Sequence, residues 1–312
     1  MILIAGIPTE SPVEMATDAA EKAGIDYVLF NQREAHNYNL SLKCINNRFN
    51  GIININGREF DLSSFSGIYL RMMDYYFLPE IRNKVFHYIG DTLAGKTIST
   101  HVQLLNWLET TNIRVFNKPW DMLSNMSKPY QAQIIAKAGF RIPPTCISSD
   151  PESIKKFLLK NKSLIYKSIS SARSIVKELD KTGIQELERV KYLPTQFQKK
   201  LRGHNIRVHV VGDVLFATKA ESEVVDYRYA RREEKEVKLT SFKLPSIVQK
   251  NCFRLAKELN LMFCGIDLFL TSRGEYYCFE VNPSPGYSYY QQHAGQNIAD
   301  AIVKWLEYGT AK

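Results

Sequence analysis

The sequence of 312 residues lacks most features of secreted, membrane or thiol-dependent proteins. Its five cysteines are scattered and form no Cys-x-x-Cys pair, which argues against a disulfide framework or a thiolate zinc site and favours a reducing cytoplasm. No apolar run approaches the roughly 20 residues that a membrane helix needs. The apolar start at residues 1–6 has no basic region before it, so it predicts a first strand rather than a signal peptide.

The sequence also contains no His-Glu-x-x-His, no Gly-x-Ser-x-Gly, no repeat and no low-complexity tract. What it has is 45% hydrophobic residues, enough for a packed core, and 41 Lys and Arg against 32 Asp and Glu, a formal net charge of +9. That excess predicts an anionic partner. Nucleic acid, nucleotide phosphates, a membrane surface and an acidic polypeptide all satisfy it.

The order of apolar segments predicts an α/β protein that begins with a mostly parallel sheet, because strands alternate with helices. Helices are expected at 11–24 and over a long stretch at about 79–110, for which a break near Gly95 is left open. A hairpin is expected within 46–61. After residue 119 the pattern changes to antiparallel strands and shorter helices, which predicts an α+β arrangement for the rest. Strands are expected at residues 1–5, 26–30, 67–71, 113–116, 195–200, 205–211, 214–220, 263–271 and 275–281.

Three oxygen-bearing side chains fall on the last two expected strands. Asp267 lies in the apolar segment Cys264–Leu270, and Glu280 and Asn282 follow a turn at Ser272–Gly274. Residues two apart share a strand face, and cross-strand neighbours lie close together, so these side chains can converge. Two carboxylates and an amide suit magnesium (Mg²⁺), which shares its coordination sphere with water and phosphates. Polar edge residues are the plain alternative, but apolar neighbours indicate buried strands, where carboxylates need partners.

Several motifs occur in a fixed order around these residues. They are Asn125-Met126-Ser127-Lys128, the segment Lys137–Thr145, Gly265-Ile266-Asp267 and Phe279-Glu280-Val281-Asn282-Pro283-Ser284-Pro285-Gly286. From roughly Ile113 onward the chain thereby resembles the ATP-grasp ligases, most closely the RimK-like branch that joins carboxylates to amines. The resemblance implies an N-terminal α/β pre-ATP-grasp domain (1–116), a central subdomain with the lid and first nucleotide-binding half (117–198), and a C-terminal subdomain with the metal site (199–312).

The resemblance also implies roles for single residues. Mg²⁺ is expected on Asp267, Glu280 and Asn282, and Arg207 and Arg228 are expected to be catalytic. Substrate contacts are expected at Arg71, Arg173, Ser284 and Gly286, Arg71 because strand ends in open α/β sheets face the ligand crevice. ATP is expected to contact Lys128, Lys167, Gln198, Lys199 and Leu201. Taken singly, a strand-end lysine or an arginine in a basic loop is usually only a solvated charge.

One loop and one single residue depart from the family pattern. The loop Ser168–Ser174 carries serines and Arg173 where many relatives have glycines whose backbone approaches the phosphates. Asn205 stands where the glutamate-ligase branch tends to have an acidic residue. The second departure argues against assuming glutamate as the substrate.

The resemblance implies an enzyme that uses ATP to convert a substrate carboxylate into an acyl phosphate, which an amine, or a hydroxyl, then attacks. ADP and phosphate are released. A basic segment, Arg228–Lys238, favours an acidic peptide or protein as substrate. A small amino-acid carboxylate, or a non-catalytic ATP-binding module of the same fold, remains the alternative. A nucleic-acid partner is disfavoured because no recognition motif accompanies the basic residues, no membrane partner is expected, and a homo-oligomer is left open.

Overall fold

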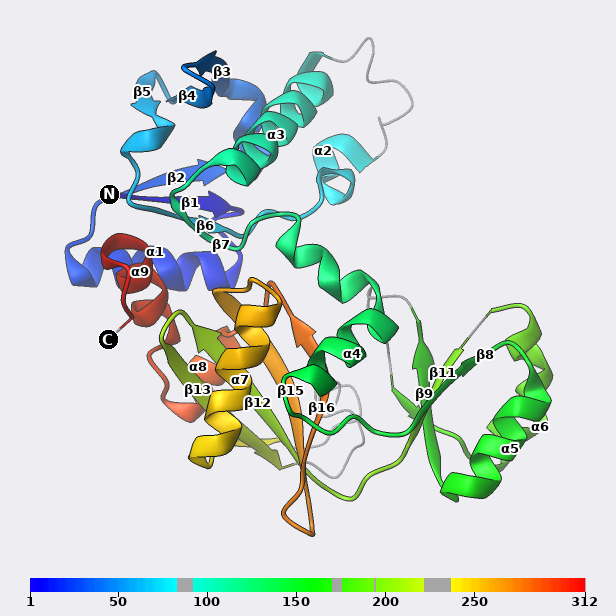
Figure 1. The fold of residues 1–312 in the computed structure, drawn as a ribbon. Helices are drawn as coiled ribbons and strands as arrows, with labels where there is room; N and C mark the ends of the chain where they lie inside the picture. Colours follow the sequence, from blue (N-terminus) through cyan, green and yellow to red (C-terminus); the bar gives the residue numbers. More distant parts are fainter. Residues whose placement is uncertain (83–91, 170–175, 194, 222–236, 312) are drawn as a thin grey trace.

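A computed structural model describes residues 1–82, 92–169, 176–193, 195–221 and 237–311 (Figure 1). It confirms the predicted α/β class, since one parallel sheet is followed by antiparallel sheets. Each of the units predicted at 1–116, 117–198 and 199–312 corresponds to one sheet of four or five strands. The bounds of the units stay a prediction. No helix in these ranges is long and apolar enough to cross a membrane.

The N-terminal sheet has the order β2-β1-β6-β7, with all pairs parallel. Its strands are β1 (Ile2–Gly6), β2 (Tyr27–Asn31), β6 (Gly67–Leu70) and β7 (Arg114–Phe116). They are apolar on both faces because helices cover both: α3 (Thr92–Thr110) lies on one side, and α1 (Ser11–Ala23) and α9 (Ile298–Tyr308) lie on the other (Figure 1). The last helix of the described chain therefore packs under the first sheet.

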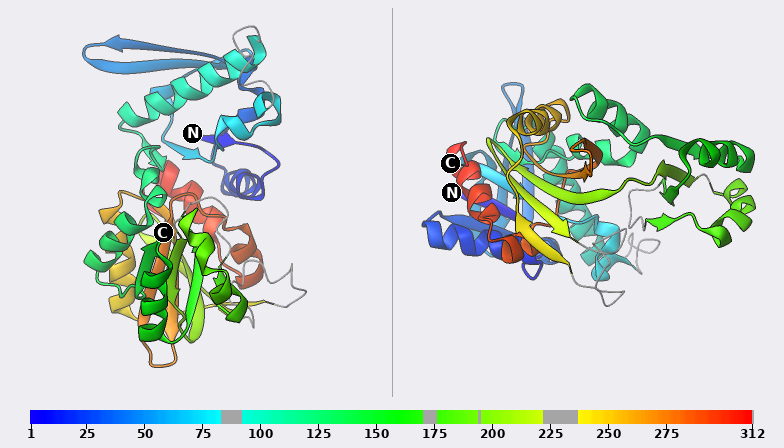
Figure 2. Two further views of the ribbon diagram at one scale, coloured as in Figure 1. Left: turned by 90° about the vertical axis from the view of Figure 1, so that its right-hand side faces the viewer. Right: turned by 90° about the horizontal axis from the view of Figure 1, so that it is seen from below.

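A hairpin forms within 46–61 as expected, and an additional strand that precedes it extends it to three strands. The strands are β3 (Asn39–Ile45), β4 (Arg48–Ile55) and β5 (Arg58–Asp61), and the long ribbon of β3 and β4 extends beside α3 (Figure 2). Asn46 and Asn47 adopt positive φ in the first turn, a conformation that asparagine tolerates. The expected helical stretch 79–110 contains α2 (Pro79–Arg82) and α3, and residues 83–91 lie outside the described ranges.

The central sheet is small and antiparallel, in the order β10-β9-β11-β8. It has its own core, to which Ile154 of α5 and the later residues Leu187 and Val190 contribute. The elements of this part of the chain are α4 (Lys128–Lys137), which precedes the sheet and packs in a different core, β8 (Thr145–Ser148), α5 (Pro151–Asn161), β9 (Leu164–Ser168), β10 (Lys177–Glu178), α6 (Lys181–Gln185) and β11 (Thr195–Lys199).

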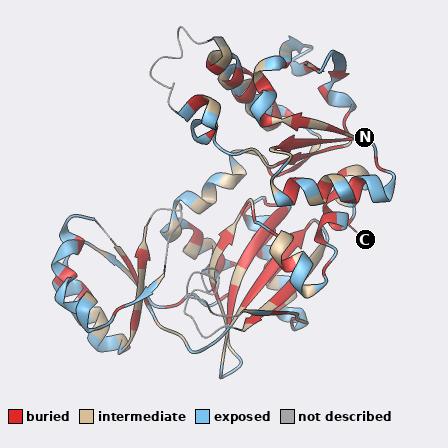
Figure 3. Ribbon diagram, turned by 180° about the vertical axis from the view of Figure 1, so that it is seen from behind, coloured by how far each residue is buried: buried red, intermediate tan, exposed pale blue. Residues whose placement is uncertain are grey.

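The C-terminal sheet has the order β14-β13-β12-β15-β16, and nearly all of its strand residues are buried or partly buried (Figure 3). One face packs on α7 through alternating apolar residues such as Val208 and Ile266. The elements are β12 (Gly203–Val211), β13 (Val214–Glu221), β14 (Lys238–Ser241), α7 (Ser246–Glu258), β15 (Phe263–Thr271), β16 (Tyr276–Asn282) and α8 (Ser288–Ala294). Short 3-10 helices are η1 (Gln32–Asn37), η2 (Leu62–Ser64), η3 (Tyr75–Phe77), η4 (Asp121–Met126) and η5 (Leu187–Lys191).

Gly67 allows α9 to lie directly against the N-terminal sheet. A Cβ at this residue would lie 2.4 Å from the carbonyl oxygen of Leu306 and 2.8 Å from its Cα. We expect Gly67→Ala to displace α9 and to lower the free energy of unfolding by about 1–3 kcal/mol, measured by urea denaturation. Gly286→Ala is the control, because a Cβ there meets open space. Equal stability of the Gly67 variant and the wild type would mean that α9 does not pack this closely in solution.

Candidate active site

Three adjacent strands of the C-terminal sheet present polar side chains on one face. The register pairs Arg207 of β12 with Asp267 of β15, Asp267 with Glu280 of β16, and Gly265 with Asn282. Residues directly opposite each other share a face, so the predicted metal ligands and Arg207 lie together. The other face of the same strands is apolar and packs on α7.

A β-bulge adjusts β16 to these two faces. The register shifts after Asp267: Leu268 lies opposite Cys278, so Phe279 has no partner residue on β15. Strict alternation would place Cys278 on the same face as Glu280. With the extra residue, Cys278 joins the buried apolar face with Leu268, while Glu280 stays opposite Asp267.

Two cations lie beside the two carboxylates. Arg207 Nη1 is 2.7 Å from Asp267 Oδ1, and Lys167 Nζ of β9 is 3.6 Å from Glu280 Oε2. The exposed fractions of the Arg207 and Lys167 side chains are only 7% and 8%. Partly buried carboxylates side by side need such compensation. Because Lys167 belongs to the central sheet, its contact with Glu280 also joins the two sheets.

Gly265 makes room for the Arg207 guanidinium. A Cβ on Gly265 would lie 2.0 Å from Arg207 Nη2 and 2.4 Å from its Cζ. Beside it, Arg207 Nε donates to His209 Nε2 at 3.4 Å, and the Tyr290 ring centroid is 5.8 Å from the Arg207 Cζ. Burial lowers the pKa of His209 well below its ordinary value, and the Arg207 charge lowers it further, so the ring is neutral next to the guanidinium.

The residues expected to contact ATP lie on or beside the central sheet. Lys128 opens α4, and its Nζ donates to the Ser168 carbonyl at 3.0 Å, next to Lys167 at the end of β9. Gln198 is buried in β11, and its Nε2 donates to Thr145 Oγ1 at 3.1 Å. Lys199 is exposed and Leu201 is half-buried just after β11.

The structure brings some of the expected substrate residues together. Arg71, at the end of β6, donates from Nη1 to the carbonyl and hydroxyl oxygens of Ser284 at 2.8 and 2.9 Å. The Gly286 carbonyl lies 3.3 Å from His209 Nε2. Arg173 and Arg228 lie outside the described residues, and their roles stay predictions.

Two buried amides support the site without a local sequence signal. Gln131 of α4 accepts from the Val281 N–H and donates to its carbonyl, both at 2.9 Å, so it satisfies the backbone of edge strand β16. Asn117 donates to the Pro283 carbonyl at 2.7 Å and accepts from the Phe263 N–H at 3.0 Å. Both contacts join residues far apart in sequence, so local periodicity does not reveal them.

The donor set fits Mg²⁺ held jointly with phosphates. In the described ranges no group of three or more His, Cys, Asp or Glu residues forms a metal cluster. The predicted set contains two carboxylates, and its third member is the Asn282 amide, whose Oδ1 accepts the Ser284 N–H at 3.0 Å. When Mg²⁺ binds together with a nucleotide, the protein usually supplies only a few oxygen ligands and the phosphates supply others. The two carboxylates and one amide, with cations nearby for phosphate, match that mode of binding rather than a site built from protein ligands alone.

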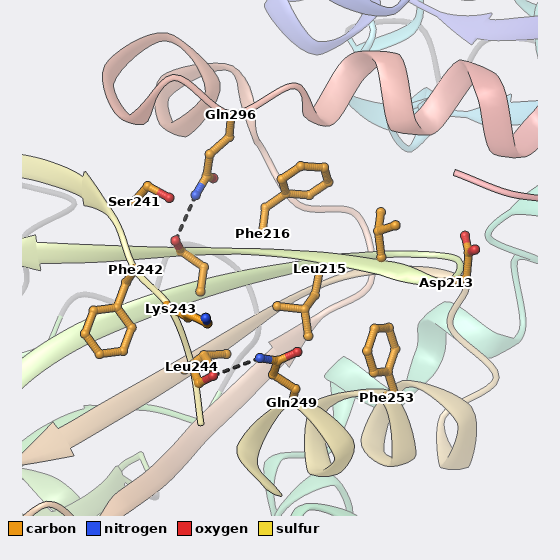
Figure 4. A pocket seen from close by; sticks show the side chains of 12 residues that line it. Asp213, Leu215, Phe216, Ser241, Phe242, Lys243, Leu244, Gln249, Phe253 and Gln296 are labelled. Atoms are coloured by element: carbon orange, nitrogen blue, oxygen red, sulfur yellow. Dashed lines mark hydrogen bonds between the residues drawn. The ribbon is translucent and has the colours of Figure 1, made fainter. Parts of the chain in front are cut away.

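A separate pocket of about 470 Å³ lies along the outer edge of β13, between β14 and α7 (Figure 4). Phe216, Phe242 and Phe253 line it, and Gln249 donates to the Leu244 carbonyl at 2.8 Å. It contains none of the expected catalytic, nucleotide or metal residues. Its lining mixes apolar and polar residues, and it is distinct from the charged face of β12, β15 and β16.

Comparisons with known proteins agree with this fold. A model of the RimK-like ATP-grasp domain matches residues 126–306. A probable alpha-L-glutamate ligase of Psychromonas ingrahamii is 25% identical over 228 residues, which cover 69% of this chain and 72% of that protein. The structure of the ATP-grasp ligase PsnB with a phosphomimetic variant of a minimal precursor, Mg and ADP has a TM-score of 0.81 at 21% identity, covering 100% of this chain and 98% of that chain. The macrocyclase MdnC of Microcystis aeruginosa MRC, bound with precursor peptide MdnA, has a TM-score of 0.80 at 20% identity, covering 99% and 100%.

The close approach at Gly265 can be tested by adding one methyl group. We expect Gly265→Ala to displace the Arg207 guanidinium from Asp267 and to lower the free energy of unfolding by about 1–3 kcal/mol. Urea denaturation measures the change, with the exposed turn substitution Ser272→Ala as control. In an Arg207→Leu background, Gly265→Ala should lower the free energy of unfolding by less, because the atoms that clash belong to the guanidinium. An equal cost in both backgrounds would contradict this account.

Proposed function

Because the chain belongs to the RimK-like ATP-grasp domain family, which matches residues 126–306, we propose that it is an ATP-dependent carboxylate–amine ligase acting on a peptide or protein. The observation that carries the proposal is the row Arg207, Asp267, Glu280, Lys167 at the junction of two sheets. It combines oxygen ligands for Mg²⁺ with cations for phosphate.

In the proposed reaction a substrate carboxylate oxygen attacks the γ-phosphorus of ATP, which gives an acyl phosphate and ADP. An amine then attacks the acyl carbon and expels inorganic phosphate, so an amide forms and the amine loses a proton. Phosphoryl transfer depends mainly on positioning and on neutralising charge. Bound Mg²⁺ on Asp267, Glu280 and Asn282 would supply part of that neutralisation.

The chain's own cations supply the rest. Lys167 lies near the end of β9, Lys128 contacts the Ser168 carbonyl at that end, and both would contact the nucleotide phosphates. Arg207 would face the transferred phosphate, because Asp267 and His209 hold its guanidinium in one orientation and a planar fork suits phosphate oxygens. Gln198, Lys199 and Leu201 would contact the adenine, and Arg228 would act at the substrate.

The buried cysteines fit a reaction that needs no protein thiolate. Burial raises the pKa of Cys252, Cys264 and Cys278 above the ordinary value, which keeps these thiols protonated at neutral pH. The proposed chemistry uses the substrate carboxylate and amine instead.

Two observations support a peptide or protein substrate. PsnB and MdnC have precursor segments bound in structures that share this fold, and the relative from Psychromonas ingrahamii is named a glutamate ligase. A crosslink within one peptide and the addition of an amino acid are both carboxylate–amine ligations. The mass change of the product distinguishes them: the first loses one water, and the second gains one amino-acid residue.

The metal ligands give the test of this proposal. We expect Asp267→Asn and Glu280→Gln to lower ADP release from Mg-ATP and an acidic peptide by roughly 100-fold or more, because charge stabilisation of the transferred phosphate is lost. Coupled ADP detection and mass spectrometry of the peptide measure the reaction. Glu275→Gln is the control, since Glu275 lies at the other end of the same hairpin, paired with Arg141. Failure of the wild type to release ADP with any acidic peptide or amino acid would reject the ligase, and equal release by the wild type and Asp267→Asn would reject the ligand roles.

A further inference from the structure

The loop 283–287, which directly follows Asn282, is held from several parts of the chain. Asn117 donates to the Pro283 carbonyl, and Tyr287 donates from its hydroxyl to the Pro12 carbonyl at 2.6 Å. Tyr287 is fully buried. Such a loop has little freedom, and Asn282 at its start shares that restriction.

Arg71 makes the largest set of contacts with this loop. Its Nη1 donates to the Ser284 carbonyl at 2.8 Å, to the Ser284 hydroxyl at 2.9 Å and to the Pro285 carbonyl at 3.1 Å. Its Nε and Nη2 donate to Glu10 Oε1 at 3.1 and 2.8 Å. All three guanidinium nitrogens are thus engaged by the protein, and the side chain is only 13% exposed.

These contacts form a short path to the metal ligand. Arg71 fixes both oxygens of Ser284, and the Ser284 N–H donates to Asn282 Oδ1 at 3.0 Å. The N–H therefore fixes the direction of the amide oxygen that is expected to face the metal. Outer partners of a metal ligand orient it in this way, and their loss weakens metal binding.

The other end of the path lies in the N-terminal sheet. Arg71 follows β6, and its N–H donates to the Ala5 carbonyl of β1 at 2.7 Å. Glu10 lies just before α1 and accepts from the guanidinium on the side away from the loop. The Arg71 side chain is therefore anchored in one unit and directed at a loop of another.

We propose that Arg71 is a positioning residue that acts from the N-terminal sheet, through Ser284, to fix Asn282 for Mg²⁺-dependent nucleotide binding. This role replaces the substrate contact expected from its strand-end location, because the guanidinium nitrogens are engaged by Glu10 and the loop. The proposal rests on the proposed function for the identity of the metal and the nucleotide. Its test needs neither the substrate nor the ligation reaction.

The experiment compares nucleotide binding with and without the metal. A non-hydrolysable ATP analogue is titrated into the full-length wild type and Arg71→Gln by calorimetry, across a series of Mg²⁺ concentrations and in EDTA. We expect Arg71→Gln to raise the half-saturating Mg²⁺ concentration roughly 10-fold or more, as for other outer partners of metal ligands. Affinity in EDTA should stay at the wild-type value, because Lys128 and Lys167 do not depend on this loop. A merely structural defect would weaken binding of the analogue both with Mg²⁺ and in EDTA.

Matched variants distinguish the loss of the contacts from Arg71 through Ser284 to Asn282 from the general effect of losing an ion pair. Arg33→Gln removes another Arg–Glu pair of the N-terminal unit, with Glu80, and should leave the Mg²⁺ dependence unchanged. Arg71→Lys keeps the charge opposite Glu10 but lacks the fork that reaches both sides, so it should behave like Arg71→Gln. Hydrogen exchange of residues 280–290 should increase in both Arg71 variants and not in Arg33→Gln.

Each outcome has one meaning. If the folded Arg71 variants keep the wild-type Mg²⁺ dependence and loop exchange, the positioning role is wrong while the proposed ligase stands. If Arg71→Gln does not fold, Arg71→Lys decides by the same criterion. If the wild type binds the analogue neither with Mg²⁺ nor in EDTA, the proposed function itself fails, and with it this role.

Discussion

Two carboxylates placed side by side on neighbouring strands are the constraint on which the rest of the site depends. Asp267 and Glu280 are direct cross-strand partners and both are partly buried, an arrangement that repels unless positive charge is close. Arg207 and Lys167 supply that charge from two different sheets. Gly265 makes room for the Arg207 guanidinium, and a neutral His209 adds no further charge. Arg207, Lys167 and the glycine that makes room for Arg207 thus follow from one electrostatic requirement.

Much of this site follows from local sequence rules, and the reason is physical. Alternation along a strand and cross-strand proximity depend only on short-range geometry, so Asp267, Glu280 and Asn282 could be placed on one face from the sequence. The α/β class follows in the same way, from the alternation of strands and helices. The bulge at Phe279 could not be predicted, because it depends on which face must bury Cys278.

The remaining features depend on contacts between distant residues. Gln131 and Val281 are 150 positions apart, and Arg71 and Ser284 are 213 apart. Nothing in the surroundings of Gln131 or Arg71 in the sequence indicates these partners. The extra strand β3 was missed for a different reason: its turn uses two asparagines in place of the glycine that usually marks a hairpin. Long-range polar contacts and unusual turn residues therefore limit what sequence patterns predict.

The packing of α9 under the N-terminal sheet affects how this protein can be divided or recombined. The sheet that begins the chain is covered by a helix from its far end, with Gly67 directly against Leu306. A fragment that lacked the first sheet would expose the apolar face of α9, and one that kept only the first sheet would expose the face that α9 covers. Chimaeras that exchange the first unit between relatives must therefore exchange the surface of α9 with it.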